Sequence, residues 1–109
     1  MRVEIIPCLK DNYSYLIIDD SNKSACVVDP SEAKPIINYL KNKDINLKYI
    51  LNTHHHFDHI GGNEDLKKGF GSIVVGFKKD SERIPGIDIF LEDDQIWEAD
   101  NFKAKIIHV

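Results

Sequence analysis

The chain has 109 residues, of which 42% are hydrophobic and 29% are charged, and its 14 Lys and Arg against 18 Asp and Glu give a formal net charge of −4. This length and composition fit one globular domain and exclude a disordered acidic chain, and the apolar runs are too short to span a membrane. The basic residues are scattered rather than clustered, so neither nucleic acid nor a membrane is predicted as a partner.

Short strand-like runs dominate the first third of the chain. Residues 3–9, 14–19 and 25–29 are rich in Ile, Val and Tyr and are separated by turn residues, which predicts three strands in a meander. From Pro35 the apolar residues recur at helical spacing, and proline suits the first turn of a helix, so we expect a short helix over about residues 33–43.

Residues 47–52 are predicted to form a fourth strand, which is followed by a polar cluster. A second short helix is expected next, with Asn63 as its N-cap, acidic residues in its first turn, lysines in its last turn and Gly69 as its C-terminal stop. Further strands are predicted over residues 72–77, 87–91, 95–98 and 103–109. This order of elements predicts an α/β (α+β) fold, with a mixed sheet covered by two short helices.

The polar cluster holds four of the five histidines and an aspartate, in the order Thr53-His54-His55-His56-Phe57-Asp58-His59. Because side chains alternate along an extended chain, His54 and His56 point to one side and His55 to the other. Asp58 and His59 follow as the chain turns towards the helix, so they are placed to hold a second ion.

Imidazole and carboxylate groups suit Zn²⁺, Fe or Mn²⁺, and the lack of cysteine beside the cluster argues against a closed structural zinc site. The spacing therefore predicts a catalytic site for two metal ions. The alternative is a solvated polar loop that caps the second helix.

The segment from Thr53 to Asn63 resembles the His-x-His-x-Asp-His signature of the metallo-β-lactamase superfamily. Residues 6–16 and 27–30 resemble the opening strands of its glyoxalase II (hydroxyacylglutathione hydrolase) group, so that the resemblance extends over almost the whole chain. Within that family the resemblance implies two ligands for a first metal ion, His54 and His56, and two for a second, Asp58 and His59.

Two further roles follow from the same resemblance. Asp29 is expected to lie behind a ligating imidazole and to fix its tautomer, the alternative being a simple turn residue before Pro30. His55 is expected to be structural, since its direction opposes the ligand pair and the family does not use it as a ligand.

The resemblance implies the first half of an αββα sandwich. The family completes its site with a third histidine in a Pro-Gly-His-Thr-like segment, a bridging aspartate and a last histidine, and this chain contains none of them. His108 belongs by pattern to the strand before that segment, so we expect it to pack or to meet solvent. We interpret residues 1–109 as a partial domain that lacks the C-terminal half and the substrate-binding helical region. Its inner sheet face is expected to expose apolar surface on the order of several hundred Å².

In the complete family enzyme, the resemblance implies hydrolysis of a 2-hydroxyacyl-glutathione thioester such as S-lactoylglutathione. Two divalent metal ions, with zinc preferred over iron or manganese, would supply the attacking hydroxide, and Asp58 would both ligate metal and orient that hydroxide. Three hypotheses remain open for this chain. It is a fragment that is inactive alone; or it is a metal-binding half-domain that associates with a separate C-terminal half or with itself; or it serves another hydrolase or dioxygenase of the same fold.

The sequence also points to a cytoplasmic location. A charge and a proline interrupt the apolar residues that follow Met1, so no signal-peptide core is predicted. The cysteines Cys8 and Cys26 form no Cys-x-x-Cys motif, and we expect both to be reduced, with Cys26 buried in a strand.

Overall fold

The structure is a computed structural model that describes residues 1–8, 12–52, 62–77, 86–92 and 95–105. Its elements in chain order are β1 (Arg2–Cys8), β2 (Asn12–Asp19), β3 (Ser24–Val28), α1 (Lys34–Leu40), β4 (Asn46–Asn52), α3 (Asn63–Phe70), β5 (Ile73–Phe77), β6 (Ile89–Leu91), β7 (Ile96–Ala99) and β8 (Phe102–Lys105).

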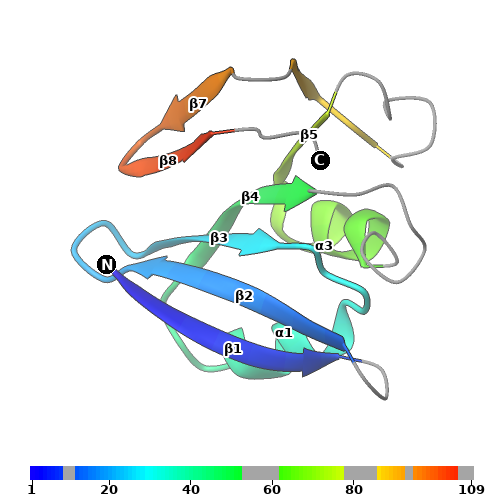
Figure 1. The fold of residues 1–109 in the computed structure, drawn as a ribbon. Helices are drawn as coiled ribbons and strands as arrows, with labels where there is room; N and C mark the ends of the chain where they lie inside the picture. The colour runs from blue at the N-terminus through cyan, green and yellow to red at the C-terminus, as the bar shows by residue number, and fades with distance from the viewer. Residues whose placement is uncertain (9–11, 53–61, 78–85, 93–94, 106–109) are drawn as a thin grey trace.

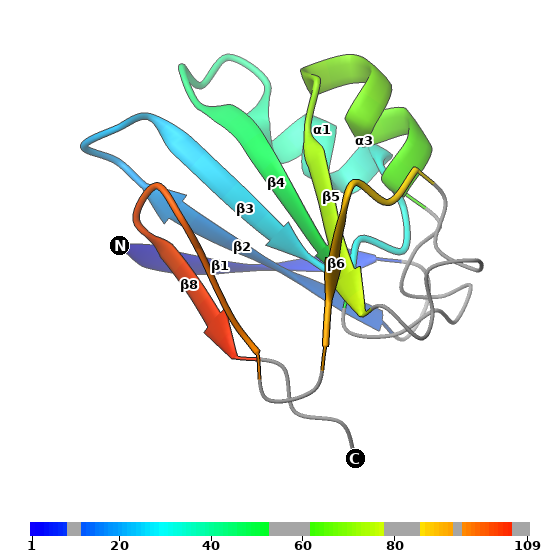
Figure 2. The ribbon, with the colours of Figure 1, turned by 90° about the horizontal axis from the view of Figure 1, so that it is seen from above.

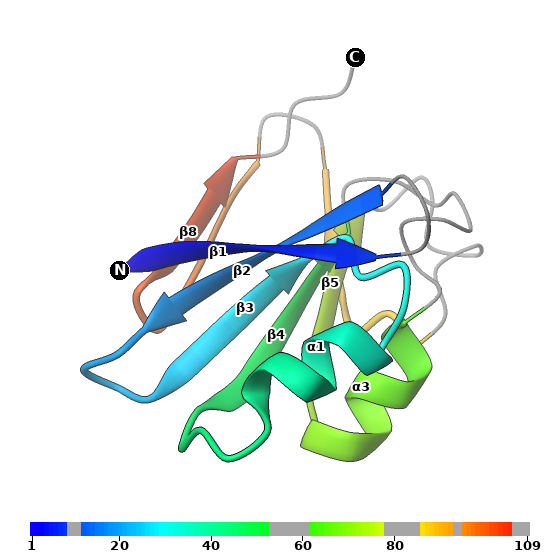
Figure 3. The same ribbon diagram turned by 90° about the horizontal axis from the view of Figure 1, so that it is seen from below.

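Six of the strands form one mixed sheet. They lie side by side in the order β1 to β6, with antiparallel pairing from β1 to β3 and parallel pairing from β3 to β6. Strands β7 and β8 form a separate antiparallel hairpin. Both helices cover one face of the sheet, and the hairpin lies across the other face (Figures 1 and 3). The predicted mixed sheet with two short helices is confirmed for the described part of the chain.

The helix-covered face carries the larger of two cores. Helix α1 contributes Ile36 and Leu40, and helix α3 contributes Leu66. These pack against buried sheet residues that include Leu16, Ile18, Ala25, Val27, Leu47, Ile50 and Val74. The register of β4 against β3 shifts beside Lys48, which explains how Leu47 and Ile50 come to share a face although three positions separate them.

The opposite face carries the second core, under the hairpin (Figure 2). The ring of Trp97 on β7 and the ring of Phe102 on β8 meet Tyr49 of β4 edge-on, with centroid separations of 5.1 and 5.9 Å. Cys26, Leu51, Val75 and Leu91 complete this core. The inner face, which the sequence predicted to be uncovered, is therefore covered over its central strands by the chain's own hairpin.

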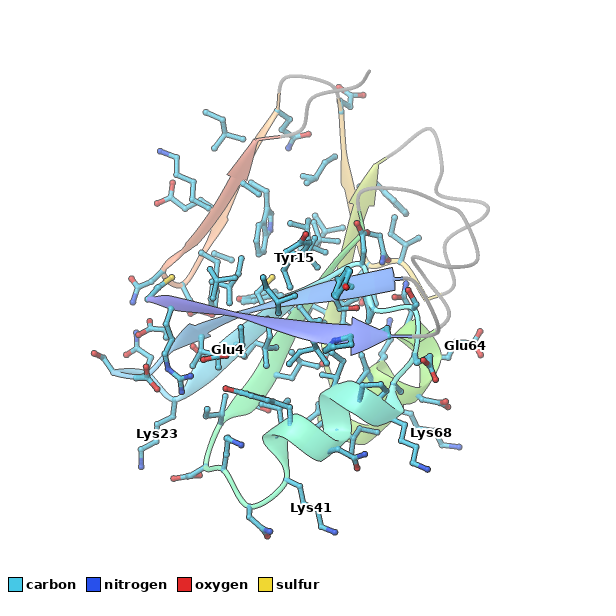
Figure 4. The ribbon with its side chains drawn as sticks, turned by 60° about the horizontal axis from the view of Figure 1, so that its bottom comes forward. Glu4, Tyr15, Lys23, Lys41, Glu64 and Lys68 are labelled. Carbon is cyan, nitrogen blue, oxygen red and sulfur yellow. The ribbon has the colours of Figure 1, made fainter. Side chains whose placement is uncertain are left out.

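Apolar exposure remains on the outer strands of the same face. Val3, Ile5, Tyr13 and Tyr15 are each between 46% and 59% exposed on β1 and β2, and Tyr15 lies on the hairpin side of the sheet (Figure 4). Ile5 pairs with Tyr15 across the two strands, so these side chains form one strip. Among the described residues, the expectation of an exposed apolar face thus holds for β1 and β2, and Ile73 at the start of β5 is also 39% exposed.

The helix ends differ from those predicted. Helix α3 has Gly62 rather than Asn63 as its N-cap, and it runs through Gly69 to Phe70 before Gly71 ends it at a left-handed φ of 69°. Helix α1 is shorter than expected, at seven residues. None of the helices in the described ranges is long and apolar enough to cross a membrane.

Candidate functional site

The predicted metal ligands His54, His56, Asp58 and His59 lie outside the described residues, as do His55 and His108. The described ranges contain no group of three or more His, Cys, Asp or Glu side chains that could hold a metal ion. What the structure does describe is the frame on either side of residues 53–61. It consists of the residues after β3, the end of β4 and the start of α3.

Strands β3 and β4 end at the same edge of the sheet, because they are parallel and pair Val28 with Leu51 (Figure 2). The backbone N–H of Asp29 donates a 2.9 Å hydrogen bond to the carbonyl of Leu51, which extends this pairing past the end of β3. In open α/β sheets, ligands bind outside the carboxyl ends of parallel strands. In the sequence, the predicted motif follows directly after β4, which ends at Asn52.

Asp29 itself has a positive φ of 53° and is 8% exposed. This conformation is uncommon for a residue with a Cβ atom, and a following proline restricts the backbone further. A buried hydroxyl supports it, because Ser14 Oγ donates a 2.8 Å hydrogen bond to the Asp29 carbonyl and lies 3.2 Å from Cys8 Sγ. Strained backbone of this kind persists where its surroundings hold it, and it gathers at functional sites.

Gly62 joins the start of α3 to the loop after β3. Its N–H donates a 2.8 Å hydrogen bond to the carbonyl of Pro30. A Cβ atom built at Gly62 would lie 2.8 Å from the backbone carbon of Glu32 and 2.9 Å from the nitrogen of Ala33. This close approach of two backbone segments is the reason why glycine is required here. The backbone conformation is not, because a φ of −92° is open to any residue.

Two buried asparagines close the base of the segment between β4 and α3. Asn52 Nδ2 donates to Asn63 Oδ1 at 3.2 Å, and Asn63 Nδ2 donates to Asn52 Oδ1 at 2.5 Å. Both side chains are fully buried. Sequence reasoning assigned Asn63 to helix capping and gave Asn52 no role. The sequence does contain a hint of this pair. Asn52 is a polar residue at the end of a buried strand, and Asn63 follows it eleven positions later.

Lys67 fixes the far side of α3 to the sheet. Its Nζ donates to both carboxylate oxygens of Asp88, at 2.7 and 2.8 Å, and to the carbonyl of Gly86 at 2.7 Å. Asp88 in turn accepts a 2.9 Å hydrogen bond from the N–H of Val74 on β5. Helix α3 is thus held at its start by Gly62 and Asn63 and in its last turn by this ion pair.

Residues 54–59 carry a set of nitrogen and oxygen donors. Three imidazoles and a carboxylate at the predicted ligand positions supply the nitrogen and oxygen donors that Zn²⁺, Fe and Mn²⁺ take in proteins. The frame places both ends of their segment at the carboxyl edge of the sheet, and a strained carboxylate residue, Asp29, lies at the same edge. The residues present therefore fit a divalent metal site.

Sequence comparison identifies a family. A model of the metallo-beta-lactamase superfamily matches residues 10–96. A hydroxyacylglutathione hydrolase of Pelagibacter ubique (strain HTCC1062) is 60% identical over 109 residues, which are all of this chain and 46% of that protein. A hydroxyacylglutathione hydrolase of Crocosphaera subtropica is 42% identical over 110 residues, covering all of this chain and 43% of that protein. The chain thus spans less than half the length of these curated relatives.

Structural comparison agrees with the family. The crystal structure of the B3 metallo-beta-lactamase BLEG-1 superposes with a TM-score of 0.81 at 25% identity, over 95% of this chain and 59% of that one. The crystal structure of ETHE1 from Myxococcus xanthus has a TM-score of 0.75 at 20% identity, over 94% of this chain and 46% of that one. The second likeness concerns the fold alone.

Proposed function

Since the chain belongs to the metallo-beta-lactamase superfamily, we propose that it carries the first part of a dinuclear metal site of a thioester hydrolase, of the hydroxyacylglutathione hydrolase type. The observation that carries this proposal is the 60% identity to the Pelagibacter ubique hydroxyacylglutathione hydrolase, which extends over every residue of the chain. The substrate class is then a 2-hydroxyacyl-glutathione thioester such as S-lactoylglutathione.

Each residue of the motif has a separate task in this proposal. His54 and His56 would hold a first divalent ion, and Asp58 and His59 a second, with zinc preferred over iron or manganese. Such ions supply a hydroxide at neutral pH and polarise the carbonyl that it attacks. Asp58 is the proposed catalytic residue of this chain, because its carboxylate would also accept a hydrogen bond from the attacking water and so orient it. Asp29 would fix the tautomer of a ligating imidazole.

The chain alone is proposed to bind metal without turning over a thioester. The four ligands leave each proposed ion with two protein donors, whereas catalytic zinc sites use three. The remaining ligands and the glutathione-binding residues would come from sequence corresponding to the part of the relatives that this chain does not match. We also propose a cytoplasmic location, which is supported by the free cysteines Cys8 and Cys26, because reduced thiols are the rule in that compartment.

The decisive experiment joins residues 1–109 to the unmatched remainder of the Pelagibacter ubique relative. The chimera, loaded with Zn²⁺, is expected to hydrolyse S-lactoylglutathione, and the 109-residue chain alone is not. His54→Ala and Asp58→Asn should abolish turnover by the chimera and lower its zinc content. His55→Ala is the matched control at the neighbouring histidine and should change neither. A chimera that folds and binds zinc but does not cleave the thioester would refute the substrate class.

A second candidate activity has its own supporting observation. The likeness to a B3 metallo-beta-lactamase at a TM-score of 0.81 makes β-lactam hydrolysis the natural competitor. The same chimera should therefore be assayed on a β-lactam, and cleavage of that substrate alone would favour the competitor. The exposed apolar strip on β1 and β2 supports a further alternative, in which the chain pairs with a separate C-terminal half or with itself. Native mass and metal content of the purified chain decide that alternative.

A further inference from the structure

The amide pair between Asn52 and Asn63 is costly in a buried position. Each side chain has zero exposure, and each donates one hydrogen bond to the other. Two apolar side chains of the same shape would fill this volume without any desolvation penalty, and such replacements are often neutral for stability or favourable. What apolar contacts lack is direction, since the hydrophobic effect depends on buried area and not on angle. A reciprocal amide pair therefore specifies geometry more than it adds stability.

Asn63 also forgoes a role that its position offers. Asparagine is among the preferred residues at helix N-termini, where its side chain accepts a hydrogen bond from a free backbone N–H. Helix α3 has no such side-chain cap, because Gly62 occupies the N-cap position and Asn63 points inward to Asn52. The helix begins without the stabilisation that an asparagine cap gives. The side chain of Asn63 bonds to Asn52 instead of capping the helix.

The location of the pair connects it to the proposed metal site. Asn52 is the last residue of β4 and Asn63 is the first residue of α3, so every proposed ligand lies in the ten residues between them. Full burial and reciprocal bonding let the pair hold these two positions in one relative orientation. In metal sites, groups that only orient the ligands typically contribute ten- to hundredfold to metal affinity.

We propose that Asn52 and Asn63 are positioning residues, whose mutual amide bonds fix the spacing and direction of the two ends of the ligand segment and thereby raise its affinity for a divalent ion. This inference rests on the proposed metal-binding function. It assigns the two side chains a shared task, because each amide donates a hydrogen bond to the other. Neither side chain is proposed to touch the metal.

The test is a double-mutant cycle on the 109-residue chain, with Zn²⁺ affinity and thermal unfolding measured for each variant. Asn52→Leu and Asn63→Leu each remove one member of the buried amide pair and the two hydrogen bonds between them, so each should lower the melting temperature and weaken Zn²⁺ binding by about tenfold. The double variant, Asn52→Leu with Asn63→Leu, removes both amides together and should recover part of the melting temperature lost in the single variants. Its Zn²⁺ affinity should nevertheless remain about tenfold below that of the unsubstituted chain.

The absorption spectrum of bound Co²⁺ supplies a readout that stability alone does not move, since its intensity reports coordination geometry. Asn38→Leu, on the exposed side of α1, is the matched control and should leave affinity and spectrum unchanged. A double variant whose affinity and Co²⁺ spectrum return to those of the unsubstituted chain would show a purely structural role. So would single variants with unaltered affinity. Failure of the unsubstituted chain to bind Zn²⁺ or Co²⁺ would instead overturn the proposed function itself, and the positioning role with it.

Discussion

Tyr49 Oη donates a 2.8 Å hydrogen bond to Oδ2 of Asp100, and this bond joins the central strand β4 to the turn of the β7–β8 hairpin. Beside it, Asn101 Nδ2 donates a 2.8 Å hydrogen bond to Asp19 Oδ2 at the end of β2. Asp100 takes a left-handed φ of 52° in that turn. Two side-chain bonds thus anchor the hairpin at its turn, while Trp97 and Phe102 hold its strands by packing.

Tyr49→Phe should lower the free energy of unfolding by about 0.5–1.5 kcal/mol at pH 7, the usual contribution of one hydrogen bond. Burial, and next the bond to Asp100, raise the pKa of Tyr49 above its ordinary value of 10.0. A raised folded-state pKa means that this contribution is fully present below pH 10 and is lost as the pH rises through the folded-state value. Urea unfolding from pH 7 to 11 should therefore show a shallower alkaline decline for the variant. Tyr15→Phe, at an exposed tyrosine, is the control and should unfold like the unsubstituted chain.

Gly62→Ala should destabilise the fold by about 1–3 kcal/mol, as overpacking of a close contact does. The added Cβ would meet backbone atoms of Glu32 and Ala33, which cannot turn aside as a side chain can. Gly69→Ala is the matched control within α3, because a Cβ at Gly69 meets nothing within 4 Å. Alanine there should stabilise the helix by roughly 0.5–1 kcal/mol. Equal effects of the two substitutions in chemical denaturation would contradict the close approach at Gly62.

Cys26 should resist alkylation in the folded chain. It is 1% exposed, and burial raises the pKa of its thiol to about 12. Because the thiolate is the reactive form, only about one thiol in ten thousand would be ionised at pH 8. The test uses a Cys8→Ala variant, in which Cys26 is the single remaining cysteine. Iodoacetamide labelling followed by mass spectrometry should show modification only as denaturant unfolds the chain. Rapid labelling under native conditions would show that the hairpin does not keep Cys26 covered.

Substitutions of Asp29 can separate the effect of its left-handed backbone conformation from the proposed role of its carboxylate in orienting a metal ligand. Asn tolerates a left-handed φ as Asp does, so Asp29→Asn should change stability little while lowering Zn²⁺ affinity about tenfold, if the carboxylate orients a ligating imidazole. Asp29→Gly should lower the affinity similarly and should not raise stability much, because glycine adopts the left-handed φ freely but loses more conformational freedom on folding. Calorimetric Zn²⁺ titration and thermal unfolding of both variants decide the matter. Unaltered affinity in both would reduce Asp29 to a turn residue.

Strand positions were predictable because runs rich in Ile, Val and Tyr lie between turn residues. The helix ends were not, and α3 shows why. Local signals at Asn63 favour an N-cap, but the side chain found a partner eleven residues earlier, in Asn52, which no local pattern encodes. Gly69 and Gly71 both carry the C-terminal signal, and only Gly71 takes the left-handed conformation that ends the helix. A tertiary contact thus decided the beginning of the helix.

The position of the β7–β8 hairpin was not predicted. The sequence predicted its two strands, but not that they would fold back over the face expected to stay open. The partners of Trp97 are Tyr49 and Phe102, and Tyr49 lies far away in the sequence on β4. For the candidate site, residue type and spacing predicted the ligand motif, which lies outside the described residues. The close backbone approach at Gly62 and the buried amide pair of Asn52 could be recognised only in the three-dimensional structure.

One feature of the frame bears on how such sites diversify. The bonds from Asp29 to Leu51, from Gly62 to Pro30 and between Asn52 and Asn63 use no side chain from residues 53–61. These bonds on either side of the segment therefore do not depend on which amino acids the segment carries. A segment of equal length with different donor residues could therefore replace residues 53–61 between the same two ends. The same fold could in this way acquire new chemistry without a change in its core.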